Sequence, residues 1–348
     1  MNKYIKNFLG AFSEDLGIDL GTSKTLICTK KKGVILSEDS VVVINSKTKE
    51  IFEFGNIAKK MIGKTPSYLE AIRPLKNGVI ADYEVTEKML RNFYKKTNSK
   101  KLISTPRVIL CVPAGGTQVE KRAVIEVARE AGAREAYLIE EPIAAAIGMG
   151  LDIFDANGYM VVDIGGGTSE ITVISLGGVI KASSFRVAGD RIDIAIMEYI
   201  RQKYNLAIGE VTSEDIKKAV GCVVEQEEEL EIEVSGRSTL NGLPKSIIVV
   251  SSELISIMGE LTEEIIEEIR AILEMTPPEL SSDIKRNGIY LSGGGALIRG
   301  LDKKIENATG TKVHVPDNSR YHVISGIQKV LESFNKYKNV LITTETEY

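Results

Sequence analysis

Residues 159–173 read YMVVDIGGGTSEITV, two apolar runs separated by a glycine-rich segment. The apolar run at 160–162 predicts a buried strand, and the run at 170–174 predicts its antiparallel partner. Between them lies a short polar turn with three consecutive glycines at 165–167. Because glycine lacks a Cβ, we expect this turn to adopt positive φ and to let a ligand approach the backbone closely.

The side chains around this turn suit a phosphate and its metal ion. The three glycine amides, with the hydroxyls of Thr168 and Ser169, can surround an anion such as a phosphate. Asp163 ends the first strand, where its carboxylate can hold a hydrated Mg²⁺ that the phosphate carries. Taken alone, the segment could also be a glycine-rich hairpin with one polar strand end and no ligand.

The same pattern occurs near the N-terminus, where residues 17–25 read GIDLGTSKT. Asp19 corresponds to Asp163, and a strand-like segment follows each turn. The two aspartates lie about a domain's length apart. A duplicated hairpin at this spacing predicts two halves of similar topology that face each other, so that one triphosphate is held between two turns.

Composition bounds the class of protein. The chain has 348 residues and a formal net charge of −4, which predicts two domains and argues against nucleic-acid binding. The cysteines (Cys28, Cys111 and Cys222) are widely spaced, so we expect reduced, mostly buried thiols in a cytoplasmic protein. The two histidines, His314 and His322, form no metal-binding pattern. No apolar run is long enough to span a bilayer.

The first twelve residues place apolar side chains at helical spacing. Met1, Tyr4, Ile5, Phe8, Leu9 and Phe12 form one stripe, which Lys3 and Lys6 flank. This pattern is typical of a short amphipathic helix that lies in a membrane interface. A helix docked on its own domain, or a disordered leader, is the alternative.

A second group of candidates follows the strand predicted at 135–139. Pro142 suits the first turn of a helix, which places Glu141 at the N-terminal end of that helix. Glu141 could simply interact with the helix dipole. Alternatively, it points to a ligand and orients or deprotonates a water that attacks a γ-phosphate.

Further candidates come from the second half of the chain. Gly189 and Asp190 precede a helix predicted at 194–203, and the next helix, predicted at 213–220, carries Glu214 and Lys217. A Glu/Lys pair at this spacing usually belongs to a solvated helix face, but it could also hold a ribose. Residues 293–296 form a third glycine turn after a predicted strand, where an adenine or ribose could approach the backbone. Residues 236–243 are expected to be a hairpin turn.

At this point the chain resembles the superfamily of actin, sugar kinases and heat-shock-chaperone ATPases and, within it, the MreB-like bacterial actins. The resemblance covers residues 16–331 and rests on a dense series of motifs. These are GIDLGTSKT (17–25), AIRPLKNGVIADYEVTEKML (71–90), CVPAGGTQVEKRA (111–123), GAREAYLIEEPIAAAIG (132–148), VVDIGGGTSE (161–170), IGEVTSEDIKKAVG (208–221), GLPK (242–245), TPPEL (276–280) and LSGGGALIRGLD (291–302).

The resemblance implies an α/β, actin-like ATPase fold with two duplicated lobes, each with a smaller inserted subdomain, and a nucleotide cleft between them. It implies binding and slow hydrolysis of ATP and assembly into antiparallel double filaments at the inner membrane face, for cell shape or motility. The implied divisions are a leader (1–13), subdomain IA (14–38, 75–151 and 324–342), subdomain IB (39–74), subdomain IIA (152–187 and 250–323), subdomain IIB (188–249) and a mobile tail (343–348).

The resemblance also assigns roles to the matching positions. Asp19 and Asp163 would serve Mg²⁺ through water, and Glu141, helped by Ser169, would activate the attacking water. The implied ATP/ADP-binding residues are Gly21, Thr22, Ser23, Lys24, Gly165, Gly166, Gly167, Thr168, Ser169, Gly189, Asp190, Glu214, Lys217, Gly293, Gly294, Gly295 and Ala296. The implied partners are further copies of the chain, paralogous MreB-like subunits and membrane lipid through residues 1–12, but no nucleic acid.

Three positions depart from the pattern of that family. Ser169 stands where a second threonine is usual, Ser23-Lys24 replace Ala-Asn, and Ala188 replaces the first glycine of a GGD turn. The missing methyl of Ser169 could loosen the site and slow hydrolysis. Lys24 would place a cation near the phosphates.

Other functions remain open from the sequence. One is a paralogue that binds nucleotide, hydrolyses it weakly and co-assembles with other family members. Another is a soluble ATPase of the same fold. A chaperone would need a peptide-binding domain after the ATPase core, and a sugar kinase would need a substrate pocket with a catalytic aspartate; the sequence offers a candidate for neither.

Overall fold

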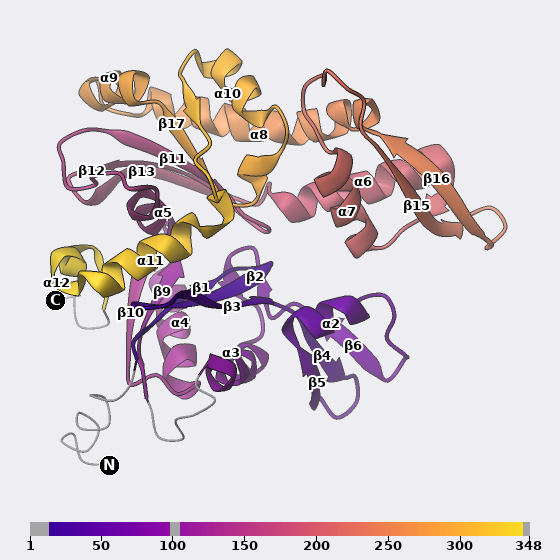
Figure 1. Ribbon diagram of the computed structural model, residues 1–348, viewed down its shortest axis with the longest axis horizontal. Coiled ribbons are helices and arrows are strands. Elements are labelled where there is room, and N and C mark those ends of the chain that lie inside the picture. The colour runs from indigo at the N-terminus through magenta and orange to yellow at the C-terminus, as the bar shows by residue number, and fades with distance from the viewer. Residues whose placement is uncertain (1–13, 98–104, 344–348) are drawn as a thin grey trace. The chain divides into compact units, whose positions relative to one another are not determined.

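The computed structural model describes residues 14–97 and 105–343, which form two compact units (Figure 1). Unit 1 takes the described residues up to Asn157, the segment Ile174–Ala182 and the residues from Arg320 onward. Unit 2 takes Gly158–Val173 and Ser183–Ser319. The predicted leader at residues 1–13 and most of the predicted tail lie outside the described residues.

A five-stranded sheet forms the centre of unit 1, in the order β10-β9-β1-β2-β3. The strands β1, β2 and β3 form an antiparallel meander, whereas β9 lies parallel to both β1 and β10. The bounds are β1 Leu16–Leu20, β2 Lys24–Thr29, β3 Gly33–Asp39, β9 Arg107–Val112 and β10 Glu135–Glu140.

The second five-stranded sheet has the order β13-β12-β11-β17-β18, with β17 parallel to both β11 and β18. Its bounds are β11 Tyr159–Ile164, β12 Ser169–Ser175, β13 Gly178–Phe185, β17 Ile289–Ser292 and β18 Val313–His314. Only four residues join β11 to β12, so the two neighbours run antiparallel. When the second sheet is read from β18 to β13, its order matches that of the first sheet strand for strand, so that β11 corresponds to β1 and β12 to β2. This match confirms the duplicated α/β fold predicted from the two aspartate turns.

Smaller sheets are inserted into both units. In unit 1, β4 (Val42–Asn45), β5 (Ile51–Phe54) and β6 (Leu69–Ile72) pack with α2 (Gly55–Met61), and a two-stranded ribbon of β7 (Leu75–Lys76) and β8 (Val79–Ile80) follows. In unit 2, β14 (Leu206–Ala207), β15 (Glu231–Ser238) and β16 (Pro244–Val250) form a three-stranded sheet. The turn predicted at 236–243 starts too early, because Gly236 and Arg237 still pair with β16.

The helices complete the two units. Unit 1 contains α3 (Tyr83–Thr97), α4 (Gln118–Glu130), α5 (Glu141–Met149), α11 (His322–Glu332) and α12 (Phe334–Tyr337). Unit 2 contains α6 (Gly189–Tyr204), α7 (Glu210–Val220), α8 (Ile255–Glu274), α9 (Pro278–Asn287) and α10 (Leu301–Thr309). Short 3₁₀ turns lie at Ser251–Leu254, Gly295–Leu297, Ser319–Tyr321 and Lys338–Val340.

The starts of several helices differ from the predictions. The helices expected at 194–203 and 213–220 begin earlier, at Gly189 and Glu210. Glycine at or before a helix start is a poor helix signal, so these first turns were missed. Helix α8 ends at Glu274, and Pro278 then opens helix α9, since proline is tolerated in a first turn. The described residues include no helix that is both long and apolar enough to cross a bilayer.

Helices cover both faces of the sheet in unit 1. Figure 1 shows α3 and α4 on one side of β1 to β3, and α5 with α11 on the other. Helix α4 starts with a capping box, in which the Thr117 hydroxyl accepts from the Glu120 amide and the Glu120 carboxylate accepts from the Thr117 amide. The buried side chains on the α3/α4 side belong to one cluster with the sheet, including Ile18, Leu90 and Val127.

Helices α5 and α11 cross at unusually close range. A Cβ on Gly326 would lie only 1.8 Å from the Ala144 carbonyl oxygen, and a Cβ on Gly148 would lie 1.9 Å from the His322 carbonyl oxygen. Both contacts are with backbone atoms, which cannot rotate away. Only glycine therefore permits this crossing, and the crossing fixes α5, the helix that begins with Glu141.

We predict that Gly326→Ala destabilises the protein by about 1–3 kcal/mol or more, because the added methyl overpacks the crossing. Gly259→Ala in α8 is the matched control, because the nearest atom to its Cβ would be the flexible Lys304 ammonium at 3.7 Å. That control should stabilise the protein by about 0.5–1 kcal/mol through helix propensity. Thermal unfolding of both variants checks this, and a Gly326→Ala protein as stable as the parent would contradict it.

Candidate functional site

The two aspartate turns have the same hydrogen bond. Gly21 N donates to the Lys24 carbonyl at 3.1 Å, and Gly165 N donates to the Thr168 carbonyl at 2.9 Å. Each turn follows a strand whose next-to-last residue is the aspartate, Asp19 in β1 and Asp163 in β11. The duplication therefore extends from strand order to the backbone of the candidate phosphate-binding turns.

The prediction of positive φ in the turn at 165–167 is wrong. Neither Gly21 nor these three glycines are among the residues with φ in the left-handed region. Instead, the turn contributes acceptors, because the Gly165 carbonyl accepts from Gly189 N at 3.2 Å and the Gly166 carbonyl accepts from Asp190 N at 2.8 Å. The turn thus lies directly against the first turn of α6.

The third glycine turn packs on the end of β11. Gly293 has φ of +81°, and a Cβ there would lie 2.3 Å from the Ile164 carbonyl oxygen and 2.7 Å from Asp163 Oδ1. A Cβ on Gly295 would lie 2.1 Å from the Ile164 side chain. Strand β17 brings this turn into place, because its last residue, Ser292, pairs with Asp163. Unit 2 thus gathers the turns at 165–168, 189–190 and 293–296 around Asp163.

Asp163 has the properties of a cation-binding carboxylate. It is buried, burial raises the pKa of its carboxyl group, and its Oδ2 atom has no hydrogen-bond partner in the described part of the chain. A buried carboxylate oxygen without a partner is costly, and a hard cation such as Mg²⁺ would satisfy it. Within residues 14–97 and 105–343, no group of three or more His, Cys, Asp or Glu could hold a metal alone, so phosphate and water would have to supply the other ligands.

Lys217 supports the turn rather than pairing with Glu214. Its ammonium donates to the Gly189 carbonyl at 2.9 Å and to Asp193 Oδ2 at 2.8 Å. Glu214 instead forms an ion pair with Lys218, one residue further along α7. Burial raises the pKa of Asp193 to about 6, against the opposing effect of the Lys217 charge. Asp193 is therefore a part of the site that sequence reasoning missed.

Ser169 is fully buried and faces the protein. Its hydroxyl donates to the Val187 carbonyl at 2.5 Å, two residues before Gly189. This bond ties the start of β12 to the segment that leads into α6. In this arrangement Ser169 holds the turn against the segment that leads into α6.

In unit 1, a buried serine that the sequence analysis did not single out holds the corresponding turn. The Ser40 hydroxyl donates to the Gly21 carbonyl at 2.7 Å, and Ser40 N donates to the Ser23 carbonyl at 2.9 Å. The Thr22 hydroxyl accepts from Gly78 N at 3.0 Å. The β3 end and the β7–β8 ribbon thus fix the turn from two sides.

Lys24 does not place its charge on this turn. Its ammonium pairs with Asp39 at 3.2 Å, opposite it on β3, and Lys59 pairs with the same carboxylate at 3.3 Å. The Lys24 ammonium, which was expected near the phosphates, therefore forms an ion pair between strands β2 and β3.

Asp19 and Glu141 both lie near Cys111. The Cys111 thiol donates to Asp19 Oδ1 at 3.2 Å. Burial, followed by the charges of Asp19 and Glu141, holds the pKa of the thiol well above its usual range, so it stays protonated. Glu141 opens α5, and Pro142 lies in the first turn of that helix as predicted.

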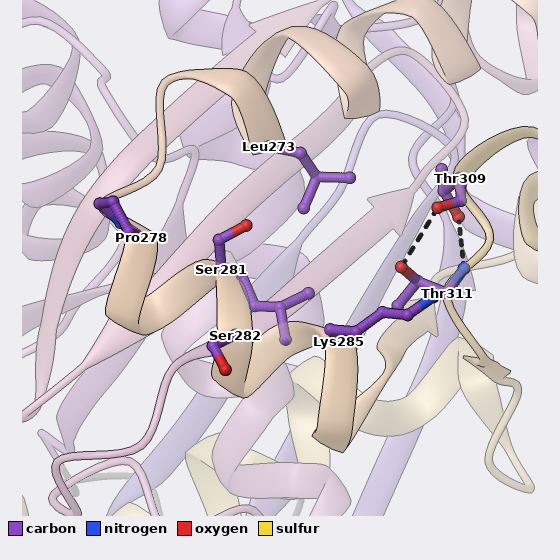
Figure 2. Close-up of a pocket in the computed structure, with 8 residues that line it drawn as sticks. Leu273, Pro278, Ser281, Ser282, Lys285, Thr309 and Thr311 are labelled. Carbon is purple, nitrogen blue, oxygen red and sulfur yellow. Dashed lines mark hydrogen bonds between the residues drawn. The ribbon is translucent and has the colours of Figure 1, made fainter.

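A separate pocket of about 500 Å³ lies between the end of α8, α9 and the loop after α10 (Figure 2). Its lining residues are Leu273, Pro278, Ser281, Ser282, Ile284, Lys285, Thr309 and Thr311. Thr311 bonds to the hydroxyl and carbonyl of Thr309, and the Lys285 ammonium donates to the Gly310 carbonyl. Much of its polar lining is thus already hydrogen-bonded, and it contains none of the predicted site residues.

Two sheets of identical strand order, each with an aspartate-glycine turn, define an actin-like α/β protein. Comparison with known proteins narrows this class. Residues 13–339 match the family model described as MreB/Mbl protein. The chain belongs to the MreB/Mbl family.

Relatives and solved structures agree with this assignment. The chain is 47% identical to the cell shape-determining protein MreB of Escherichia coli K12, over 98% of this chain and all of that protein. It is 45% identical to the cell shape-determining protein Mbl of Bacillus subtilis 168, over 93% and 98% of the two chains. A crystal structure of MreB5 of Spiroplasma citri bound to ADP matches with a TM-score of 0.89 and 35% identity, over 94% and 98%. A MamK double helical filament shares the fold, with a TM-score of 0.77 and 23% identity.

The raised pKa of the Asp193 carboxyl group predicts that the stability of the protein depends on pH. Its pKa is about 6 in the folded protein, so folding takes up a proton between about pH 4 and pH 6. The contribution of Asp193 to the free energy of unfolding must therefore fall as the pH rises through this window and stay constant above it.

We predict that the thermal midpoint of the parent minus that of Asp193→Asn falls from pH 4 to about pH 7 and is flat above about pH 7. Thermal unfolding at each pH measures this difference. If this difference instead increases with rising pH, Lys217 stabilises the Asp193 anion enough to lower its pKa. That result would contradict the raised pKa of Asp193.

Proposed function

We propose that this chain is an MreB-like ATPase that binds ATP with Mg²⁺, hydrolyses it slowly and assembles with further copies of itself into filaments. The observation that carries the proposal is the pair of equivalent turns, each closed by the same hydrogen bond and each preceded by an aspartate. The structures of Spiroplasma citri MreB5 bound to ADP and to AMPPNP support the nucleotide.

The proposed roles follow from the chemistry of each group. Amides of the turns at 21–24 and 165–168 would donate to phosphate oxygens. Asp163 and Asp19 would hold a hydrated Mg²⁺, which neutralises phosphate charge as the bond to the γ-phosphorus breaks. Gly293–Ala296 would let the nucleoside approach the backbone, and Lys217 would fix Gly189 beside the phosphates. Glu214 remains a proposed ribose-binding residue.

Glu141 is the proposed general base. It would accept a proton from a water whose oxygen attacks the γ-phosphorus, while the bond to the β-phosphate oxygen breaks and ADP leaves. The close crossing of α5 and α11 fixes the start of α5, and with it the backbone from which the Glu141 side chain extends. Ser169, bonded to Val187, would act on the rate through the shape of the turn.

We further propose that the filaments lie at the inner face of the cell membrane and serve cell shape or motility. The amphipathic pattern of residues 1–12 supports the membrane contact, and the names of the Escherichia coli and Bacillus subtilis relatives support cell shape. Paralogous MreB-like subunits are proposed as additional partners. Flotation with anionic vesicles tests the membrane contact; a chain lacking residues 1–12 that still floats would refute it.

The alternative is a family member that binds nucleotide but hydrolyses it weakly and mainly co-assembles. The buried Ser169 hydroxyl supports this alternative, because its hydrogen is already donated to the Val187 carbonyl. The two proposals differ in phosphate release by the intact protein at saturating ATP. A protein that pellets with ATP without releasing phosphate supports the alternative.

We predict that Glu141→Gln lowers the rate of phosphate release about 100-fold or more, since a positioned base contributes roughly that factor. Affinity for ATP and sedimentation with ATP should change by less than about threefold, because the amide keeps the size of the carboxylate.

Glu140→Gln is the matched control. Glu140 is the neighbouring carboxylate, and it lies 3.8 Å from the Lys121 ammonium rather than beside Asp19 and Cys111. Its substitution should leave phosphate release within about twofold, because a partly exposed ion pair contributes little. Equal activity of Glu141→Gln and the parent would remove Glu141 from the reaction.

A further inference from the structure

Cys111 occupies the central position between the two candidate catalytic strands of unit 1. It lies near the end of β9, whose residue Leu110 pairs with Ile18 of β1, one residue before Asp19. On the other side Cys111 pairs with Ile139 of β10, two residues before Glu141. The strand that carries this thiol therefore separates the proposed metal-binding carboxylate from the proposed general base.

The contact that Cys111 makes differs from those of the other cysteines. Its thiol donates to a carboxylate, Asp19 Oδ1, at 3.2 Å. Cys28 donates to the Ile324 backbone carbonyl at 3.7 Å, and Cys222 donates to the Ser251 backbone carbonyl at 3.4 Å. All three are buried, so burial alone does not distinguish Cys111.

A packing role does not require a thiol at this position. The other buried residues of β9 are Val108, Ile109, Leu110 and Val112, all without a donor. An aliphatic residue at 111 would fill the same volume but would present a methyl group to Asp19 Oδ1. A thiol is small and apolar enough for the core and still supplies a donor to the carboxylate.

We propose that Cys111 is a positioning residue for Asp19, whose thiol holds the carboxylate in the orientation that serves Mg²⁺ during ATP turnover. The inference rests on the proposed function, and it adds a residue that acts only through Asp19. It follows that Cys111 sets the Mg²⁺ concentration the reaction needs, while Glu141 sets the rate once Mg²⁺ is saturating.

The test compares Cys111→Val, Cys111→Ser and the intact chain in phosphate release at fixed ATP over a Mg²⁺ titration. Valine fills the site without a donor, and serine restores a donor in a smaller side chain. Cys111→Val should raise the Mg²⁺ concentration for half-maximal rate about three- to tenfold, which is the expected loss of one ordinary hydrogen bond, because a thiol is a weak donor. Cys111→Ser should stay within about twofold of the parent.

Cys28→Val is the matched control, because it removes a buried thiol of the same sheet, on β2, that donates to a backbone carbonyl and not to a carboxylate. It should lower the thermal midpoint without moving the Mg²⁺ requirement. A purely structural role for Cys111 would give the same pattern: a lower thermal midpoint for Cys111→Val and an unchanged Mg²⁺ requirement. That result overturns the inference.

Two further outcomes are decisive. If Cys111→Val fails to fold, Cys111→Ser decides the question. A Mg²⁺ requirement of Cys111→Ser that is close to that of the parent supports the inference. A Mg²⁺ requirement raised as far as that expected for Cys111→Val overturns it. If the intact chain shows no Mg²⁺-dependent phosphate release, the proposed function fails and the inference fails with it.

Discussion

The hydrogen bond from Gly165 N to the Thr168 carbonyl closes the turn on which the arrangement of unit 2 depends. With the turn closed, the carbonyls of Gly165 and Gly166 face the first amides of α6 and accept from them. That contact fixes the start of α6, which Lys217 then secures from α7. A chain of hydrogen bonds thus links the turn to α6 and α6 to α7.

Unit 1 uses the same turn with different supports. Here the Ser40 hydroxyl and the Gly78 amide hold the turn at 21–24, whereas α6 holds its counterpart in unit 2. The carboxylates differ as well, since Asp19 accepts from the Cys111 thiol and Asp163 keeps one oxygen without a partner. The duplicated backbone thus supports two unlike environments, in which Asp163 is the more dependent on a bound cation for charge compensation.

The sequence predicted the fold through local signals and missed the contacts that depend on distant residues. The two aspartate turns, the strands on either side of each turn and the start of α5 at Glu141 all follow from short motifs. Ser40, Asp193 and Cys111 carry no such signal, because their partners become neighbours only when the strands and helices assemble.

One interpretation was wrong. Positive φ was expected for the glycines at 165–167, but their φ angles lie outside the left-handed region, and two of their carbonyls accept hydrogen bonds from the first amides of α6. The contacts of Lys217 with Asp193 and with the Gly189 carbonyl carry no sequence signal, because these groups meet only when α6 and α7 pack together.

Binding of ATP phosphates by the two turns is tested most directly by a crystal structure with Mg²⁺ and a non-hydrolysable ATP analogue. Phosphate oxygens within hydrogen-bonding distance of the amides at 165–168 and 21–24, with a Mg²⁺ whose water ligands contact Asp163, are the predicted result. Phosphates bound elsewhere, with both turns empty, would show that these turns do not bind the nucleotide.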